Sequence, residues 1–557
     1  MKSPAPPAGT LNRRRLLLAL PALPLAGAAL ESNAEDDLDN PYADIDWDRC
    51  EFLPSMSHQH QGQTDASRDV FREMGYRHFA FSNYYPSAPT YPLPEAYLER
   101  HPDLIGAPNA EQHSFTDAGL HFNSLGSLLA TGYGSSIGSA ARATSPLIHR
   151  FEGLTVFSEA RPWAGVYRLD VQLEAVQSTA ETQPEARLTL TGAQACDFRN
   201  AFADLGPVRE KPLAVGSRTL YLRTTAPVIE MRLDYPAAGL RVTQCRLMQG
   251  SNRPWRDVFR AALDGEEIDG RRSGGLMDPE GGGITLNHPT GKLDDYTAML
   301  DFDPRVLGIE VWNQLTSGFG SERGFYSQDA SPPAHFYRLW DAILATGRRC
   351  WGFFVKDHNT YGRGRNILVV PPLADLDRSS REAAALRAYR RGAFFGSIAA
   401  LATDDQGNIV APYDRSDFRF QRIDIRRDAA GKATALGVSV AGQDTGRRPQ
   451  VQIRFVTDQG IAAVADATEA EFALPRDAAG RLIPAFVRVE AIAYPATHLG
   501  GQPLTPAFVR ERSVAELARL HDRQVDRGQP GFFGNPAELR TPIPIADLIF
   551  SQPFRRI

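Results

Sequence analysis

The chain has 557 residues, of which 42% are apolar and 23% charged, and it carries a formal net charge of −5 at pH 7. A chain of this length buries enough apolar surface to fold without a disulfide scaffold, and it predicts about two to four domains. A mildly acidic chain without a long basic run is a poor nucleic-acid binder, so we expect no nucleic-acid partner.

The first 28 residues predict an export signal. Three arginines at 13–15 precede an apolar stretch from Leu16 to Leu25, and Ala26-Gly27-Ala28 supplies the small residues of a cleavage site. The string NRRRLL resembles a twin-arginine signal, with a general secretory signal as the alternative. We therefore expect a periplasmic or extracellular protein. Cleavage would remove four of the 61 basic residues and none of the 66 acidic ones, which leaves a charge of −9. No later segment has 18 consecutive apolar residues, so no membrane span is expected in the mature protein.

The mature chain is predicted to begin with a polar linker and then to alternate between α/β and β-rich regions. Residues 29–46 are the expected linker, and 47–139 mix short apolar runs with helical segments. Residues 140–252 predict an inserted antiparallel β-sandwich, because polar and apolar residues alternate over Arg168–Glu174. Whether the Cys196–Cys245 pair in this region is bridged stays open. Further strands are expected at Leu188–Leu190, Leu220–Leu222, Val228–Leu233 and Leu240–Met248.

An α/β pattern returns over 253–402, and 403–557 are expected to form a C-terminal β-domain. The expected helices are Arg256–Leu263, Phe336–Ala345 and Arg381–Arg391. The expected strands of the α/β part are Ile284–Leu286, Val306–Trp312, Gly352–Val355 and Asn366–Val370. Those of the C-terminal part include Phe418–Ile425, Val451–Val456 and Phe486–Tyr494.

His58 and His60 are the first candidate metal ligands. They follow the apolar run Cys50–Leu53, which is expected to be a strand, and side chains two residues apart on a strand face the same way. Both imidazoles would therefore point together at the carboxyl end of this strand, where active sites of α/β barrels lie. Two histidines at this spacing are a weak signal by themselves.

Other ligand-type residues repeatedly come close to the ends of short apolar segments, for which packing gives no reason. Imidazole and carboxylate ligands without cysteine are typical of Zn, Mn or Fe sites, and one carboxylate can bridge two ions. The sequence therefore predicts a metal centre. Its candidate ligands are His58, His60, Asp65, Glu111, His121, His288, Asp357 and His358.

In these motifs the chain resembles the PHP (polymerase and histidinol phosphatase) superfamily of metallohydrolases, and within it the branch that resembles carbaryl hydrolases. The resemblance covers about 46–135 and 255–400, nearly half of the chain. It implies a distorted (β/α)7 barrel, interrupted by the inserted β-sandwich, with a multinuclear metal site at the carboxyl ends of its strands. The motifs are His58-x-His60 with Asp65, Glu111 before His121–Gly126, Asn287-His288-Pro289, Gly308–Asn313, Asp357-His358 and Tyr389–Ser397.

The resemblance also implies a role for each ligand. One ion would be bound by His58, His60, Glu111 and Asp357. Glu111 would bridge to a second ion, which His121 and His288 complete. Asp65 and His358 would belong to a third metal position, so the implied cofactors are two or three divalent ions.

Two motifs differ from the family pattern, and both concern the third position. The family usually has Asp-His after the second strand, where this chain has Ser82-Asn83-Tyr84-Tyr85. His78, at the other end of that strand, is expected to be structural. The last motif is usually Asp-x-His, whereas Asp357 and His358 are adjacent. The third position therefore lacks one usual ligand.

The predicted function is metal-dependent hydrolysis by a metal-bridged hydroxide, with a phosphate ester as the expected small-molecule substrate. The candidate catalytic residues are Asp357, Lys356, which would contact an anionic leaving group, and Tyr84, which would replace the missing histidine as a donor. Glu310 is expected either to orient the barrel or to bind metal.

Two alternatives stay open. The same centre would also cleave a carbamate or carboxylic ester, and cations that converge on the metals would favour phosphate instead. Arg323, Arg363 and Arg365 are the candidate cations. In the other alternative the barrel is degenerate and non-catalytic, and the β-modules bind carbohydrate or a partner protein.

Overall fold

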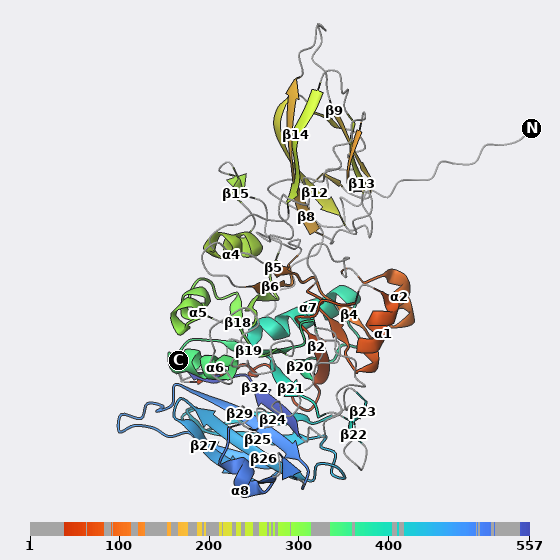
Figure 1. Ribbon diagram of the computed structural model, residues 1–557. Coiled ribbons are helices and arrows are strands. Elements are labelled where there is room, and N and C mark those ends of the chain that lie inside the picture. The colour runs from red at the N-terminus through yellow and green to blue at the C-terminus, as the bar shows by residue number, and fades with distance from the viewer. Residues whose placement is uncertain are drawn as a thin grey trace, which may run out of the picture.

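The structure is a computed structural model, shown in Figure 1. Within residues 153–248 the description concerns mainly the backbone of the strands. The expected export signal, Tyr84 and Arg323 lie outside the described residues. The structure describes residues 38–62, 64–82, 91, 93–112, 121–127, 153–157, 165–175, 186–191, 194–195, 211–213, 215–224, 230–234, 240–248, 255–264, 267–268, 271–272, 277–289, 291–313, 335–358, 363–400, 402–403, 409–411, 417–496, 498–499, 502–513, 517 and 546–557.

The fold is mixed α/β, with many strands in several sheets and few helices, which confirms the expected class. The helix α7 begins at the cap residue Asp377, whose side chain accepts from Ser380 N, and ends at Gly392, which has a φ of 78° that glycine adopts without strain. The described helices are α1 (Asp65–Glu73), α2 (Glu95–Arg100), α4 (Trp255–Asp264), α5 (Leu293–Leu300), α6 (His335–Ala345), α7 (Arg378–Arg391) and α8 (Pro506–Arg510).

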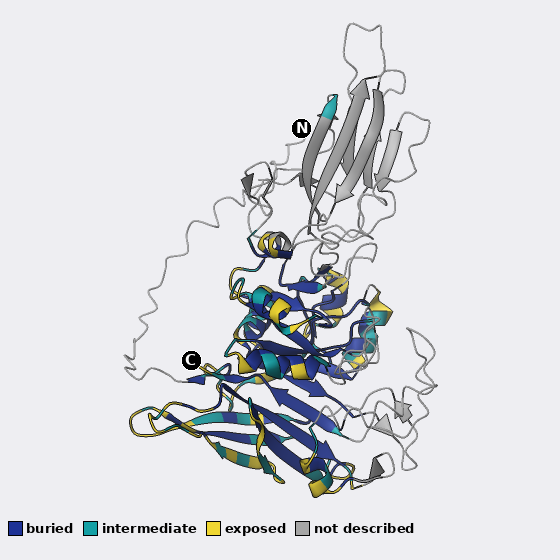
Figure 2. Cartoon of the chain, turned by 60° about the vertical axis from the view of Figure 1, so that its left-hand side comes forward, coloured by how far each residue is buried: buried dark blue, intermediate teal, exposed yellow. Residues whose placement is uncertain are grey.

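One central sheet has five strands in the order β19-β18-β17-β6-β5. The first three are parallel, and β6 and β5 continue the sheet in antiparallel pairing. Where their side chains are described, these strands are buried, as Figure 2 shows for the middle of the molecule. The strands are β19 (Trp351–Val355), β18 (Val306–Asn313), β17 (Gly283–Leu286), β6 (Phe122–Leu125) and β5 (Glu111–Gln112).

The second central sheet has eleven strands. Its main path is β1-β33-β29-β32-β21-β20-β2-β3-β4, and β26 pairs with both β29 and β27. The strands are β1 (Leu38–Asp39), β2 (Glu51–Met56), β3 (His78–Phe79), β4 (Ile105–Gly106), β20 (Gly364–Val370), β21 (Phe394–Ile398), β26 (Gln450–Thr457), β27 (Gly460–Ala465), β29 (Phe486–Tyr494), β32 (Asp547–Ser551) and β33 (Phe554–Arg556).

The two central sheets touch at their edges without closing, so a (β/α)7 barrel is not shown. At one contact Asp357 N donates to His58 O at 3.0 Å, and at the other Glu111 N, at the start of β5, donates to Ser82 O, in the segment after β3, at 3.3 Å. The sheet stays open because β20 and β21 pair antiparallel and the outer edge of β21 is taken by β32. The large sheet therefore continues into the C-terminal strands, across the domain boundary expected at 402/403.

The inserted region between β6 and β17 forms two four-stranded antiparallel sheets, which Figure 1 draws beside each other at one end of the molecule. The expected strand Leu240–Met248 is β14 with the same bounds. Because the side chains of Cys196 and Cys245 lie outside the described part, their pairing stays a prediction. The strands are β7 (Gly153–Phe157), β8 (Gly165–Ala175), β9 (Ala186–Thr191), β10 (Gln194–Ala195), β11 (Lys211–Leu213), β12 (Gly216–Thr224), β13 (Glu230–Asp234) and β14.

The end of the expected N-terminal linker, from residue 38 on, is ordered against the C-terminal strands. Tyr42 is buried, and its hydroxyl donates to Phe394 O at 2.8 Å and accepts from Gln552 N at 2.9 Å. A three-stranded sheet, β24-β25-β28, completes this end of the molecule. The remaining strands are β15 (Glu267–Ile268), β16 (Arg271–Arg272), β22 (Ala402–Thr403), β23 (Ile409–Ala411), β24 (Arg419–Arg427), β25 (Ala433–Ala441), β28 (Glu469–Ala473), β30 (His498–Leu499) and β31 (Gln502–Pro503).

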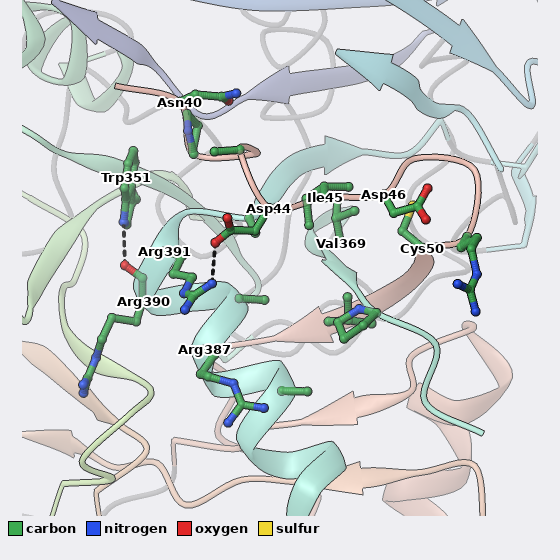
Figure 3. Close-up of a pocket in the computed structure, with 18 of the residues that line it drawn as sticks. Asn40, Asp44, Ile45, Asp46, Cys50, Trp351, Val369, Arg387, Arg390 and Arg391 are labelled. Carbon is green, nitrogen blue, oxygen red and sulfur yellow. Dashed lines mark hydrogen bonds and ion pairs between the residues drawn. The ribbon is translucent and has the colours of Figure 1, made fainter. Parts of the chain in front are cut away.

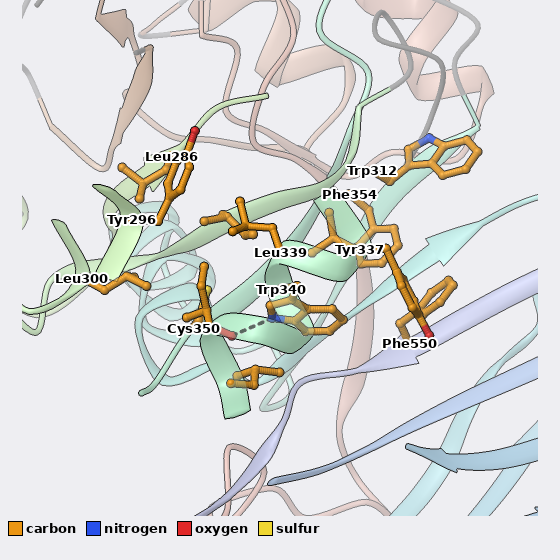
Figure 4. Packing of buried hydrophobic residues seen from close by; sticks show 14 of the residues in the cluster. Leu286, Tyr296, Leu300, Trp312, Tyr337, Leu339, Trp340, Cys350, Phe354 and Phe550 are labelled. Carbon is orange, nitrogen blue, oxygen red and sulfur yellow. Dashed lines mark hydrogen bonds between the residues drawn. The ribbon is translucent and has the colours of Figure 1, made fainter. Parts of the chain in front are cut away.

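The largest apolar cluster lies where α5 and α6 pack beside β18 and the C-terminal strands (Figure 4). Trp340 of α6 is fully buried there, and its indole N–H donates to Cys350 O at 2.9 Å. A cluster of this size holds β17, β18 and β19 as a rigid support. The described residues that follow β17 and β19, which include His288 and Asp357, are therefore held in place beside the other candidate ligands.

Candidate metal centre

All candidate ligands except Asp65 meet where the two central sheets touch. His58 and His60 follow β2, and Asp357 follows β19; Gln59, between the histidines, forms a parallel bridge with Asp357. Glu111 begins β5. His121 and His288 lie next to each other because β6 pairs antiparallel with β17, and their ring centroids are 4.9 Å apart. Residues far apart in sequence thus converge through strand pairing.

The first group of ligand atoms is packed tightly. His58 Nε2 lies 3.0 Å from His60 Nε2, and Asp357 Oδ1 lies 3.5 Å and 3.3 Å from these two atoms. Glu111 Oε2 lies 2.9 Å from His60 Nε2 and 3.6 Å from His58 Nε2. All four side chains are buried. This group has the composition that the resemblance implies for the first ion.

The second group is built around the other oxygen of Glu111. Oε1 lies 3.0 Å from His121 Nδ1 and 3.4 Å from His288 Nε2. Glu111 therefore directs one oxygen to each group, as a bridging carboxylate would.

The spacing of these atoms fits the chemistry of a transition-metal ion. Two ligand atoms that bind one ion at about 2.0–2.2 Å lie about 2.9–3.6 Å apart in tetrahedral or octahedral geometry. The distances above, from 2.9 to 3.6 Å, fall in this range. The buried group His58-His60-Asp357 and the group Glu111-His121-His288, in which His121 is partly exposed, could thus each hold a metal ion. Nitrogen and oxygen donors without cysteine suit Zn, Mn or Fe.

Electrostatics at the centre favour positive charge. Burial alone would lower the pKa of His58, but the charges of Asp357, Glu310 and Glu111 raise it well above its usual value. The pKa values of His60 and His288 are raised against burial for the same reason. Burial would raise the pKa of Asp357, yet His58 and His60 hold it well below the usual range. A field that attracts protons to the rings also attracts a metal cation, which competes with them.

The backbone is strained at two ligands. Among the described residues, His288 and Asp357 are the non-glycine residues with positive φ, at 23° and 56°. Such conformations cost about 1–3 kcal/mol each and persist where surrounding contacts hold them, commonly at functional sites. Each is the second residue after the carboxyl end of a parallel strand, β17 or β19, and its side chain lies among the other ligand atoms.

Two asparagines hold the ligand carboxylates. Asn287 Nδ2 donates to Glu111 Oε1 at 3.0 Å, and Asn313 Nδ2 donates to Asp357 Oδ2 at 3.1 Å. The sequence reading included both in family motifs but assigned them no role. The available signal was their position, next to His288 and three residues after Glu310.

The two residues of the predicted third position are not brought together with each other. Asp65 is the first residue of α1. Its carboxylate is half exposed and accepts hydrogen bonds from Arg68 Nη1 at 2.7 Å and from Arg100 Nη2 at 2.6 Å. His358 lies beside the first group, with its ring stacked on His60 at 4.1 Å. Burial and neighbouring His60 lower the pKa of His358 to about 4. The carboxylate that the third ion would need is thus already paired with two arginines.

The predicted catalytic lysine extends away from the ligand atoms. Lys356 Nζ lies 4.0 Å from Met74 Sδ and 5.1 Å from the centroid of the Tyr76 ring. Asp357 Oδ1 lies 3.5 Å and 3.3 Å from the Nε2 atoms of His58 and His60, so the side chains of the adjacent residues Lys356 and Asp357 have different neighbours. Arg363 Nε donates to Ala399 O at 2.6 Å, which is not a contact with the centre either.

His78, expected to be structural, is buried and its Nδ1 lies 2.6 Å from Ser55 Oγ. Burial lowers the pKa of His78 to about 3, so the ring is neutral. Glu310 lies directly beside the ligands, where its Oε1 accepts from His58 Nδ1 at 2.6 Å. The described contacts therefore place Glu310 behind the ligand that it touches.

A cavity of about 700 Å³ lies at the other end of the same strands (Figure 3). It is lined by Trp351 at the start of β19 and Val370 at the end of β20, whereas the ligands follow the end of β19. Two of its arginines are engaged: Arg390 donates to the carbonyls of residues 278, 279, 281 and 282, and Arg391 pairs with Asp44 at 2.6 Å. This cavity is separate from the metal centre.

Searches against models of protein families, curated proteins and solved structures gave no match for this chain. Among the described residues, no helix is both long and apolar enough to span a bilayer.

Proposed function

We propose that the chain is an exported, metal-dependent hydrolase with two ions in a PHP-like centre. The observation that carries this proposal is the carboxylate of Glu111, which directs Oε2 to His58 and His60 and Oε1 to His121 and His288. The export component rests on the basic and apolar pattern of residues 1–28 alone. The barrel component rests on the motif order and on the contact between the edges of the two central sheets.

We expect a substrate to approach past His121 and His358, the most exposed side chains at the centre. The side chains of His121 and His358 are 19% and 23% exposed, whereas those of the other ligand residues are at most 7% exposed. When bound, two divalent ions would lower the pKa of water and stabilise negative charge that develops on the substrate. Glu111 and Asp357 would supply negative charge to the ions. The strained backbone at His288 and Asp357 keeps these two side chains directed at the other ligands.

A phosphate ester is the proposed substrate, and a carbamate or carboxylic ester is the second candidate. The family resemblance supports the first. The second is favoured by the positions of Lys356 and Arg363: the described side-chain contacts of Lys356 are with Met74 and Tyr76, and those of Arg363 are with the carbonyls of Ala399 and Ala546. Both reactions use the same centre.

The proposal is tested by turnover of a phosphodiester, a phosphomonoester and a neutral aryl ester with Zn²⁺ or Mn²⁺. We expect cleavage of at least one phosphate ester, and its loss in Glu111→Ala and His121→Ala. His101→Ala is the matched control, because His101 has similar exposure, at 22%, but lies near Asp69 outside the centre. Cleavage of the aryl ester alone would move the assignment to the second candidate. Full activity in the Glu111 variant would contradict the metal-centre assignment.

A further inference from the structure

The carboxylate of Glu310 is buried behind the ligands and accepts three hydrogen bonds. Its side chain lies on β18 and is 1% exposed. Oε1 accepts from His58 Nδ1 at 2.6 Å, and Oε2 accepts from the backbone N–H of His288 at 2.6 Å and from Asn313 Nδ2 at 2.8 Å. One residue thus contacts a ligand of each metal group.

The bond to His58 fixes the orientation of that ring. When Nδ1 carries the hydrogen and donates to Glu310, Nε2 presents its lone pair to the ligand cluster. Nε2 is the atom that lies 3.0 Å from His60 Nε2. A carboxylate behind a ligating histidine also makes that histidine a stronger electron donor.

The bond to His288 acts on the second group through the backbone. His288 has a φ of 23°, and its N–H is directed at Glu310 Oε2. A charge-assisted hydrogen bond at this point offsets part of the strain of that conformation. The conformation in turn brings His288 Nε2 to 3.4 Å from Glu111.

Asn313 extends the arrangement to a third ligand. Its Nδ2 donates to Glu310 Oε2 at 2.8 Å and to Asp357 Oδ2 at 3.1 Å. Asp357 Oδ1 is then directed to His58 and His60. Among the described contacts, Asn313 reaches a ligand of the first group, Asp357, whereas Glu310 reaches a ligand of each group.

We propose that Glu310 is a positioning residue that couples the two halves of the centre: it orients His58, holds the strained backbone of His288, and aligns Asp357 through Asn313. The inference rests on the proposed metal-dependent function. Glu310 acts through the ligands and is not itself counted among them.

Metal affinity tests the inference, measured by competition with a chromophoric chelator using Mn²⁺ or Zn²⁺ alone. Glu310→Gln keeps the size of the side chain, but its amide nitrogen cannot accept a hydrogen bond, so at least one of the three donors loses its acceptor. We expect both binding steps to weaken about 10- to 100-fold, as is typical for loss of a partner behind the ligands. The melting temperature of the metal-free variant should stay close to that of the wild type. Glu382→Gln, which changes a half-buried glutamate on α7 away from the centre, should leave both affinities unchanged.

Asn313→Ala provides a second test, which stays informative if Glu310→Gln fails to fold. It removes the support of Asp357 and leaves the bonds of Glu310 to His58 and His288. We expect one of the two binding steps to weaken and the other to stay within about twofold of the wild type. Wild-type affinity at both steps in either folded variant, or equal weakening of both steps in Asn313→Ala, would overturn the inference. Failure of the wild-type protein to bind metal would instead contradict the proposed function.

Discussion

Two buried clusters of ionisable groups in this molecule are neutralised in different ways. Under α6, Arg488 binds Asp341 with two hydrogen bonds, of 2.8 and 3.0 Å, and also pairs with Glu490, to which Tyr337 donates. Its guanidinium lies 4.5 Å and 4.9 Å from the ring centroids of Tyr337 and Trp340, two rings labelled in Figure 4. A fixed cation of the chain thus serves the acids of this cluster.

In the metal centre the described partners of the acids are imidazole rings, asparagine amides and one backbone N–H. The positive charge here would come from metal ions or from protons. The backbone is strained at His288 and Asp357, whereas no non-glycine residue of the Arg488 cluster has positive φ. The comparison indicates that the Arg488 cluster is built for stability and the metal centre for binding.

The largest expected effect is the loss of metal binding in Glu111→Gln. The amide keeps the volume and can still accept from Asn287, but it cannot bridge two cations as a carboxylate does. We expect binding of both ions to fall by more than about 100-fold, beyond the loss typical of a partner behind the ligands. Isothermal titration of the metal-free protein measures this. If Glu111→Gln still bound two ions tightly, the proposed difference between the metal centre and the Arg488 cluster would be contradicted.

For Arg488→Met we expect a loss of stability and not a loss of metal binding. Its removal takes the closest cation from the buried carboxylate of Glu490 and from Asp341, whose side chain is 28% exposed, which costs about 3–5 kcal/mol of unfolding free energy. Denaturant unfolding measures the loss. Arg426→Met is the control, because Arg426 is exposed and pairs with Glu471 on the surface at 3.5 Å, which is worth at most about 1 kcal/mol. Equal effects of the two substitutions would remove the distinction.

Removal of metal should lower the thermal stability of the wild-type protein and leave the stability of Glu111→Gln unchanged. An ion present at about 100 to 1,000 times its dissociation constant stabilises the folded state by about 2.7–4.1 kcal/mol. Thermal unfolding with and without a chelator measures the difference. A chelator effect of the same size in both proteins would assign the stabilisation to some other site.

The fold and the site were predictable from the sequence to different degrees. Period-two alternation and apolar runs predicted strands such as β14 and β18, because burial on one or both faces leaves a pattern in the chain. The pairing of β21 with β32 was not predictable, because no local sequence pattern shows which strand pairs with the free edge of another. The ligands at strand ends could be named, but the roles of Asn313 and Glu310 depend on contacts across the sheet.

The smallest expected effect concerns pH and a region outside both clusters. Burial raises the pKa of Glu382 to about 7, although the hydrogen bond from Tyr91 and the charge of Arg378 oppose the rise. A raised pKa means that stability from this group is present below the ordinary value near 4.5 and is lost as pH rises through about 7. After allowance for partial exposure, the free energy of unfolding of Glu382→Gln, measured relative to that of the wild type, should rise by about 1–2 kcal/mol between about pH 5 and pH 8. Unfolding at the two pH values measures this, and parallel pH profiles would contradict it.

The metal content of the purified protein tests the central claim most directly. The protein is loaded with Zn²⁺ or Mn²⁺, separated from unbound ions by gel filtration, and analysed for metal per chain. The paired clusters that share Glu111 predict two ions per chain, reduced to less than one in Glu111→Gln. Less than one ion per wild-type chain would contradict the assignment of this site as a two-metal centre.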